Sequence, residues 1–443
     1  EMCIRDRRSP CHPGWEDPRG LHWWILRQHG SPVLDSEHPF SRRTAFASTP
    51  AGTRHDLVCH ARSNLTMGAY RKGPSQPSRD QLITLIGCNP ADVAPRRRCQ
   101  MDAVLASAAS EGVLSQVYHA LEASGGSYGM DQETLSRFRA AALNQVATTL
   151  LLRQERERVL QQLAPLGPIL LKGEALARYV YDTYADRPSG DMDLLLPTER
   201  LVEAEVILQT LGYRPQVANS SSLTMPQQAW THVLARGVAS VVDLHGSLFN
   251  RPALQTLIDY KLLRGSGSQA PGLAPGIVLP CPEHLLIHAA LHLLGHHGSG
   301  RRLIWLLDIH RLSESLDATM RSRILKFCSD QRVSGALGSV LSESVSVFNG
   351  DSDLAEALFS QAETEPDELS VQLSDRNRTP IDQALDDWRG LQNPAARMTW
   401  LHQHLFPSGE YMKRRYDVSN AFFLPWFYLW RILWGGVKLL RPR

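Results

Sequence analysis

Residues 187–197 read Arg-Pro-Ser-Gly-Asp-Met-Asp-Leu-Leu-Leu-Pro. The apolar run that begins at Met192 stops at Pro197, which is typical of a short strand. Because side chains alternate between the two faces of a strand, we expect Asp191 and Asp193 on one face and the apolar residues on the other. Two carboxylates placed this way repel each other, and a divalent cation is a usual counter-charge. The stretch therefore predicts a strand that carries a metal site.

Short apolar runs alternate with helical patterns on both sides of this strand. The expected elements are a strand at 167–171, a helix at 174–184, a helix at 198–211, a strand at 213–217, and a hairpin around Arg236-Gly237 with arms at 232–235 and 240–245. This alternation predicts an α/β (α+β) fold with a small mixed β-sheet. We assign this mixed-sheet core to residues 166–264.

Helical patterns flank the predicted core. Apolar residues recur at three- and four-residue spacing before it, which makes 67–165 an N-terminal helical region. A Gly/Pro/Ser linker or loop is expected at 265–277, and the C-terminal helical region is assigned to 278–443. Its expected elements are helices at 283–297, 301–316, 319–329 and 333–349, an acidic loop region at 351–378, and further helices from 380. Residues 1–66 show no sustained periodicity and are expected to be a disordered or non-native extension.

Composition narrows the class of protein. The 443 residues include 47 basic and 45 acidic side chains, so there is no strong nucleic-acid signal. Seven cysteines without a Cys-x-x-Cys pair argue against a disulfide framework and against a thiolate zinc site, which favours the cytoplasm. No signal peptide and no uninterrupted apolar run long enough to span a bilayer is visible.

A third carboxylate lies in the run Val241-Val-Asp-Leu-His245. A single acid among β-branched residues is unusual in a strand unless it is paired or used, so Asp243 is a candidate partner of Asp191 and Asp193. Three carboxylates on adjacent strands could hold two Mg²⁺ or Mn²⁺ ions about 3.5–4 Å apart, which is the arrangement for phosphoryl or nucleotidyl transfer.

Residues suited to phosphate lie upstream of the acids. Lys172-Gly173 stand between a strand and a helix, where glycine permits close backbone approach and the helix start offers N–H groups to an anion. Lys172 adds a point charge, Arg187 adds a forked donor, and Gly190 lies in the turn before the acids. We therefore expect these four residues to bind nucleotide.

Four short motifs carry a resemblance to a known family. They are Lys172-Gly173, Arg187-x-x-Gly190-Asp191-x-Asp193, Leu211-Gly212-Tyr213 and Val242-Asp243-Leu244-His245. In this order they resemble the uncharacterised nucleotidyltransferase family of the polymerase-β-like superfamily, from about Met101 to the C-terminus. The resemblance implies a transferase that moves a nucleoside monophosphate from an NTP such as ATP to an acceptor, which the sequence does not identify. It also implies that Asp191 and Asp193 are the paired metal ligands and catalytic acids, with Asp243 as the third.

One departure from the superfamily pattern, and other possible roles for the charged residues, leave alternatives open. The wider superfamily has Gly-Ser or Gly-Gly where this chain has Lys172-Gly173, so the serine that contacts phosphate is absent. The alternative function is a catalytically silent module that binds nucleotide or a partner protein. At the level of structure, Asp191 could cap a turn while the other two acids pair with Arg187 or Lys172, and Lys172 could simply be a solvated residue at a helix start.

The helix expected at 283–297 carries a histidine at every fourth position: His284, His288, His292 and His296. Each step of four residues advances about 40° around a helix, so all four cannot meet one ion. We expect a packed helix that lines or covers a cleft, with His288, His292 and His245 as candidate substrate contacts. A histidine-based metal hydrolase is the weaker alternative. Asp308 is expected to orient one of these histidines or to pair with Arg301 or Arg302.

The C-terminal stretch 421–443 is rich in aromatic residues and is interrupted by Pro425 and Arg431. It is too short and too interrupted to span a bilayer. We expect it to dock on the helical region; the alternative is peripheral contact with a membrane surface, with its basic residues among the head groups.

Overall fold

The computed structural model describes residues 77–87, 98–123, 131–216, 227–249, 251–297, 301–363, 380–391, 393–407, 409–416 and 420–440. The extension expected at 1–66 lies outside these residues. All the described residues belong to one compact unit.

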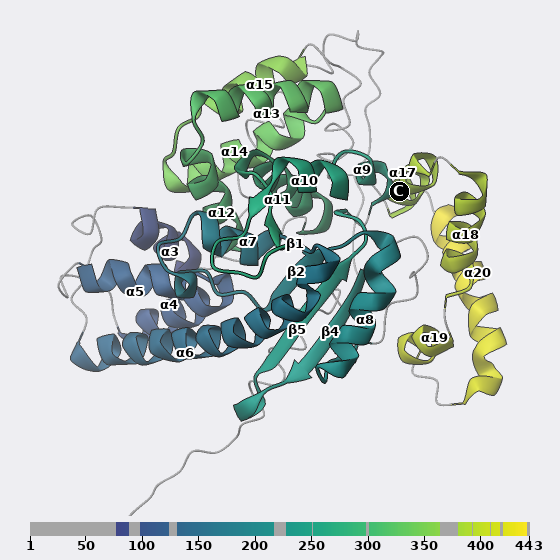
Figure 1. Cartoon of the computed structure of the whole chain (residues 1–443), viewed down its shortest axis with the longest axis horizontal. Helices are drawn as coiled ribbons and strands as arrows, with labels where there is room; N and C mark the ends of the chain where they lie inside the picture. Colours follow the sequence, from purple (N-terminus) through teal and green to yellow (C-terminus); the bar gives the residue numbers. More distant parts are fainter. Residues whose placement is uncertain are drawn as a thin grey trace, which may run out of the picture. The chain divides into compact units, whose positions relative to one another are not determined.

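A seven-stranded mixed sheet in the order β3-β4-β5-β2-β1-β7-β6 forms the centre of the fold (Figure 1). The acidic strand β2 (Asp191–Leu195) pairs in parallel with β5 (Ala239–His245) and antiparallel with β1 (Ile169–Leu170). The other strands are β3 (Arg214–Pro215), β4 (Gln227–Val233), β6 (Ser268–Gln269) and β7 (Val278–Leu279). The expected α/β class with a small mixed sheet is confirmed.

The predicted hairpin is present as β4 and β5, which pair antiparallel from Gln227↔His245 to Val233↔Ala239. The turn needs left-handed backbone, and Arg236 and Gly237 have φ values of 60° and 75°. Glycine adopts this region without steric cost, which is the physical basis of the turn signal in the sequence.

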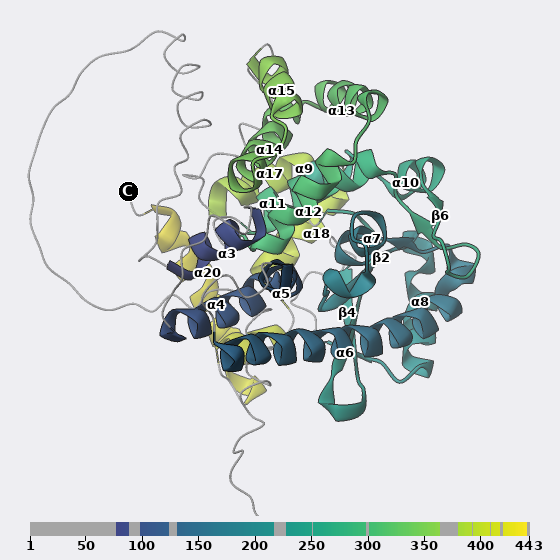
Figure 2. The ribbon, with the colours of Figure 1, turned by 90° about the vertical axis from the view of Figure 1, so that its left-hand side faces the viewer.

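Helices on the N-terminal side frame the sheet. The long helix α6 (Gln132–Leu163) begins where Asp131 accepts a hydrogen bond from the Thr134 amide, and it contacts β5 and α8 (Leu201–Thr210) (Figure 2). Before it lie α3 (Pro77–Gly87), α4 (Arg98–Glu111) and α5 (Leu114–Ala123). After β1, α7 (Lys172–Tyr179) ends five residues before the predicted boundary at 184, and a single 3₁₀ turn, η3 (Tyr184–Asp186), follows.

The segment expected to be a linker, 265–277, is partly ordered into the sheet. Helix α10 (Tyr260–Ser266) runs into it, β6 pairs antiparallel with β7, and β7 pairs in parallel with β1. A Cβ atom at Gly267 would lie 2.5 Å from the main-chain oxygen of Leu279, so this glycine serves close packing. The linker expectation was wrong here because a packing glycine and a flexible one look alike in sequence.

The C-terminal helices follow as predicted, with one correction. They are α11 (Pro282–His297), α12 (Leu303–Glu314), α13 (Ala318–Gln331) and α14 (Ser334–Phe348). Within the expected loop at 351–378, residues Asp353–Glu363 form helix α15. Its acids Asp353 and Glu356 lie in the first turn, where negative charge stabilises a helix, while Leu354 and Leu358 are buried. Residues 364–379 lie outside the described part of the chain.

The remaining helices lie at the C-terminal end: α17 (Pro380–Gly390), α18 (Pro394–Leu405), α19 (Gly409–Arg415), the 3₁₀ turn η6 (Ala421–Phe423) and α20 (Leu424–Leu440). Buried apolar residues from Leu82 to Leu358 form one core cluster. Trp400 and Met412 are buried as well, but they are not part of that cluster. Helix α17 packs on α9 (Pro252–Gln255) next to the core, whereas α18 and α19 contact α20.

Candidate metal and nucleotide site

The site is built on the two central parallel strands. Asp193 of β2 stands directly opposite Asp243 of β5, so the two carboxylates share one face of the sheet. Met192 and Val242, one position before them, point to the other face and are fully buried. The alternation expected from the sequence is therefore present, and it brings together two acids that lie 50 residues apart in the chain.

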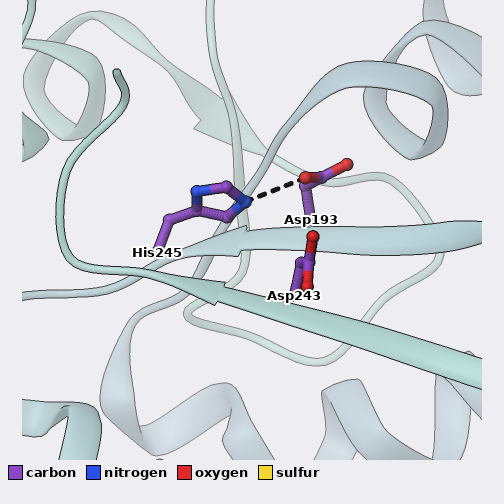
Figure 3. A group of neighbouring side chains, drawn as sticks. All are labelled: Asp193, Asp243 and His245. Atoms are coloured by element: carbon purple, nitrogen blue, oxygen red, sulfur yellow. Dashed lines mark hydrogen bonds and ion pairs between the residues drawn. The ribbon is translucent and has the colours of Figure 1, made fainter. Parts of the chain in front are cut away.

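Asp193 is the most heavily contacted of the acids. Its Oδ1 accepts a hydrogen bond from Lys172 Nζ at 2.6 Å and lies 2.8 Å from His245 Nε2 (Figure 3). Only 3% of the Asp193 side chain is exposed. Burial would raise the pKa of Asp193, but Lys172 and His245 together hold the pKa well below its ordinary value. Asp193 is therefore a buried, ionised carboxylate.

Asp243 has the opposite electrostatic character. Gln227 Nε2 donates to its Oδ2 at 3.1 Å, whereas its Oδ1 is buried without a hydrogen-bond partner in the described structure. Burial and the neighbouring charge of Asp193 raise the pKa of Asp243. A buried carboxylate oxygen without a donor is costly, and a bound cation would satisfy it.

Asp193, Asp243 and His245 have the spacing of a metal site. One ligand atom from each lies within 4.8 Å of the other two, and this is the group of three potential ligands found within the described residues. The side chains come from neighbouring strands and face one another (Figure 3). His245 was expected to contact substrate; the structure places it among the acids instead.

Asp191 lies at the edge of this group. It is half-buried at the start of β2, and the Ser189 hydroxyl donates to its main-chain oxygen at 2.6 Å. It is close enough to add to the negative potential at Lys172 and Asp243, but it is not one of the three residues with ligand spacing. The sequence grouped Asp191 with Asp193 because both lie on one face, whereas the register across strands favours Asp243 and His245.

Lys172 supplies the positive charge of the site. Its backbone has φ 47°, in the left-handed region that residues with a side chain rarely adopt. Burial opposes the charged form of the lysine, but Asp193, Asp191 and Asp243 outweigh that effect and raise its pKa. One ammonium thus faces three carboxylates, and this excess of negative charge fits an additional cation.

Gly173 allows the loop before β2 to approach α7. A Cβ atom at this position would lie 2.9 Å from Ser189 Oγ and 3.1 Å from Arg187 Nη1. Gly190, by contrast, is exposed and has open space where a Cβ would be. Ser189 was not singled out in the sequence, yet its hydroxyl fills the space that a side chain at 173 would need.

Arg187 is engaged elsewhere, which corrects its expected contact with phosphate. Its Nε and Nη2 donate to the Asp308 carboxylate at 2.7–3.0 Å, and its Nη1 donates to the Pro188 carbonyl. Tyr181 donates to the same carboxylate at 2.7 Å. Asp308 therefore pairs with Arg187, not with Arg301 or Arg302, and this buried ion pair ties the loop before β2 to α12.

A second buried network holds the other side of that loop. Arg156 of α6 donates to Glu174, to the Tyr184 hydroxyl and to the Ser189 carbonyl, the last at 2.8 Å. The Tyr184 hydroxyl donates to Glu174 at 2.6 Å, and burial raises the pKa of Tyr184 to about 12. One feature of the sequence could have predicted this network. Glu174 is an acidic residue at the start of a helix, and the residues next to it are apolar.

Three histidines of α11 have side chains that the structure describes, and they pack against neighbouring residues. His288 is buried against Phe249 and His292, while His284 lies beside Cys281 and Ser266. None of these three histidines belongs to the group with ligand spacing. The packed-helix interpretation fits these contacts, and the side chains of His296 and His297 lie outside the described set.

A protein-family model matches the part of the chain that contains the site. Residues 98–349, more than half of the chain, match the family model described as uncharacterised nucleotidyltransferase. No curated protein matches the chain. The matched segment contains β1, β2 and β5 and therefore every residue of the site described above.

Proposed function

The chain belongs to the uncharacterised nucleotidyltransferase family, and we propose that it transfers a nucleoside monophosphate from an NTP to an acceptor hydroxyl or amine with the help of Mg²⁺ or Mn²⁺. The observation that best supports metal dependence is the pair Asp193–Asp243. The two residues stand opposite each other in register, and Asp243 Oδ1 is buried without a hydrogen-bond donor in the described structure. We also propose a cytoplasmic location, which is supported by the absence of a disulfide at Cys281 and Cys328.

Asp193, Asp243 and His245 would hold the ion, with Asp191 beside them. A bound divalent ion supplies neutralisation of the charge that develops on the phosphoryl oxygens in transfer. Lys172 adds a fixed positive charge next to the same hollow, suited to a triphosphate oxygen. Asp243, directly opposite Asp193, would either bind the ion or accept a proton from the attacking hydroxyl.

Ser189 and Gly173 shape the turn where the superfamily has Gly-Ser. The single hydroxyl proton of Ser189 is donated to the Asp191 main-chain oxygen at 2.6 Å, so we infer that Ser189 holds the loop before β2 against Gly173 and leaves the phosphate contact to other groups. Gly190 and the amides at the start of α7 complete the nucleotide grip. Arg187 acts as a positioning residue, because all three of its guanidinium nitrogens are bound to protein oxygens.

The test is incubation of the chain with α-labelled NTPs and a cell extract, comparing wild type with the variants Asp193→Asn and Asp243→Asn. We expect transfer to fall by at least about a hundredfold in each, because charge stabilisation at the phosphoryl group is lost. Asp330→Asn, an exposed acid on α13, is the matched control and should retain full transfer. Label transfer that survives both site substitutions would contradict the proposal.

A second candidate is a silent module that binds nucleotide without turnover. The observation in its favour is the Lys172 ammonium at 2.6 Å from Asp193, in the position where an ion would be expected. Calorimetric binding of an NTP with Mg²⁺, without release of pyrophosphate in the presence of extract, would support this candidate over the enzyme.

A further inference from the structure

The terminal helix α20 has two apolar faces with different surroundings. One face turns toward α18 and α19, where the Phe427 ring lies 5.1 Å from that of Tyr416. On the same face, the Tyr428 hydroxyl donates to the Pro407 carbonyl, and Arg431 donates to the His404 carbonyl at 3.2 Å. These contacts agree with the docking expected from the sequence, but they account for only one side of the helix.

The opposite face of α20 is exposed. Phe422 lies in the 3₁₀ turn η6, and Trp426, Leu429 and Leu433 follow it along α20 at spacings of three and four residues, which places these three in one row. The exposed fractions of the four side chains are 82%, 65%, 49% and 57%. We call these four residues the outer stripe; Phe423, Trp430 and Ile432 are also exposed and widen it. A continuous apolar row of this kind marks an interaction surface.

The sequence that carries the outer stripe is basic, although Arg431 itself lies on the opposite face, against the His404 carbonyl. Residues 418–443 contain four basic side chains, Arg431, Lys438, Arg441 and Arg443, and no aspartate or glutamate. Aromatic side chains next to basic ones are typical of segments that lie at a membrane–water interface. Within the described part of the chain, no helix has both the length and the apolarity needed to cross a bilayer.

We propose that the outer stripe inserts into the headgroup region of a bilayer containing anionic lipids, so that α20 lies along the membrane surface. A second copy of the chain would also cover the apolar row. However, pairing two such segments would bring their uniformly basic sequences together, and an anionic bilayer neutralises that charge. An anionic bilayer therefore accounts both for the apolar row and for the basic sequence around it.

The test is flotation of the full chain with phosphatidylcholine vesicles, with and without phosphatidylglycerol. We expect at least about fivefold tighter binding to the anionic vesicles, since each basic residue near such a surface adds about that factor. Added salt should weaken the binding because it screens the surface charge. The double variant Trp426→Ser/Leu433→Ser should bind about tenfold more weakly, because it removes two large apolar side chains from the stripe.

The matched control is Val202→Ser/Val206→Ser, which removes two similarly exposed apolar side chains from α8. This variant should bind vesicles like wild type. Equal binding by the two double variants, or no preference for anionic lipid, would overturn the proposal. Self-association that the Trp426/Leu433 variant abolishes, without vesicle binding, would overturn it in favour of a second copy. No nucleotide is present, so the result is independent of the transferase assay.

Discussion

Some side chains of the candidate site are arranged for binding an ion and lower the stability of the ion-free protein. Asp243 is the clearest case, because one of its oxygens is buried without a donor and Asp193 stands directly opposite. Its folded-state pKa is raised, so its contribution to stability is present below the ordinary aspartate pKa and is lost as pH rises through the folded value. At neutral pH the ionised form therefore weakens the ion-free protein.

Asp243→Asn should accordingly raise the melting temperature of the ion-free protein at pH 7, by about 1–3 °C if the gain is about 1 kcal/mol. The gain should be smaller at pH 4 than at pH 7, because a raised pKa lets wild-type Asp243 take up a proton more readily as pH falls. Differential scanning calorimetry at both pH values, with a chelator present, measures this. An Asn variant less stable than wild type at pH 7 would show that Asp243 is satisfied by a contact in the folded protein.

His245 sets the choice of ion in the proposed site. Two carboxylates alone suit Mg²⁺, whereas an imidazole favours transition ions such as Mn²⁺. We predict that His245→Gln weakens Mn²⁺ binding about tenfold or more and changes Mg²⁺ binding much less. Titration calorimetry gives the affinities, and the ¹⁴N coupling in the electron spin echo of bound Mn²⁺ should disappear in the variant.

His284→Gln is the matched control for this experiment, since His284 lies on α11 beside Ser266 and Cys281. If His245→Gln keeps the nitrogen signal, His245 only orients Asp193 through its hydrogen bond and is not a ligand.

At the scale of elements, the loop before β2 depends on how closely it approaches the start of α7. Gly173→Ala would place a methyl group 2.9 Å from Ser189 Oγ, so Ser189 or Arg187 must move. We expect a loss of about 1–3 kcal/mol in unfolding free energy, typical of overpacking, and a higher KM for NTP. Gly190→Ala, where space is open, should stay near wild type in urea unfolding. Equal losses in the two variants would refute the packing role of Gly173.

The elements themselves were largely predictable from local patterns. The acidic strand, the hairpin at Arg236-Gly237 and the long α6 follow from period-two and period-3.6 apolar spacing and from turn chemistry. Strands β6 and β7 were missed because they lie in and next to the Gly/Pro/Ser-rich stretch 265–277, whose composition indicated a linker or loop. Helix α15 was missed because its acidic residues suggested a loop, although acids stabilise a helix start.

Two acids of the candidate site, Asp193 and Asp243, could be predicted from the sequence, whereas the hydrogen-bond partner of Arg187 could not. Asp193 and Asp243 stand out as carboxylates within apolar strands, and the structure brings them together as expected. We predicted that Arg187 binds phosphate because it is near the acids in sequence. In the structure it forms an ion pair with Asp308, which lies 121 residues further along the chain. Such a pairing depends on how α12 packs, which no local pattern records.

At the scale of the whole molecule, the last helices stand apart from the main core. The core cluster ends at Leu358, and α17 is held to the rest of the chain by its packing on residues 252–255 and by the Arg251–Asp387 pair at 3.5 Å. Deleting 409–443 should therefore leave the main thermal transition within about 2 °C and leave metal affinity unchanged, because no core residue is removed. Circular dichroism melting and Mn²⁺ titration of the shortened chain measure both. A fall of about 10 °C would show that α19 and α20 support the core after all.

The parallel pairing of β2 with β5 also has a consequence during synthesis. The two strands are joined by 43 residues that include α8, β3 and β4, so β5 is made well after β2. While the ribosome is still translating that connection, Asp191 and Asp193 are exposed without their opposing partner. The proposed ion ligands Asp193, Asp243 and His245 come together only when the β4–β5 hairpin has emerged and paired with β2, so binding of an ion there would depend on completion of the sheet. A nascent chain that is released before β5 is made would carry Asp191 and Asp193 but would lack Asp243 and His245, the other two residues of the proposed ion site.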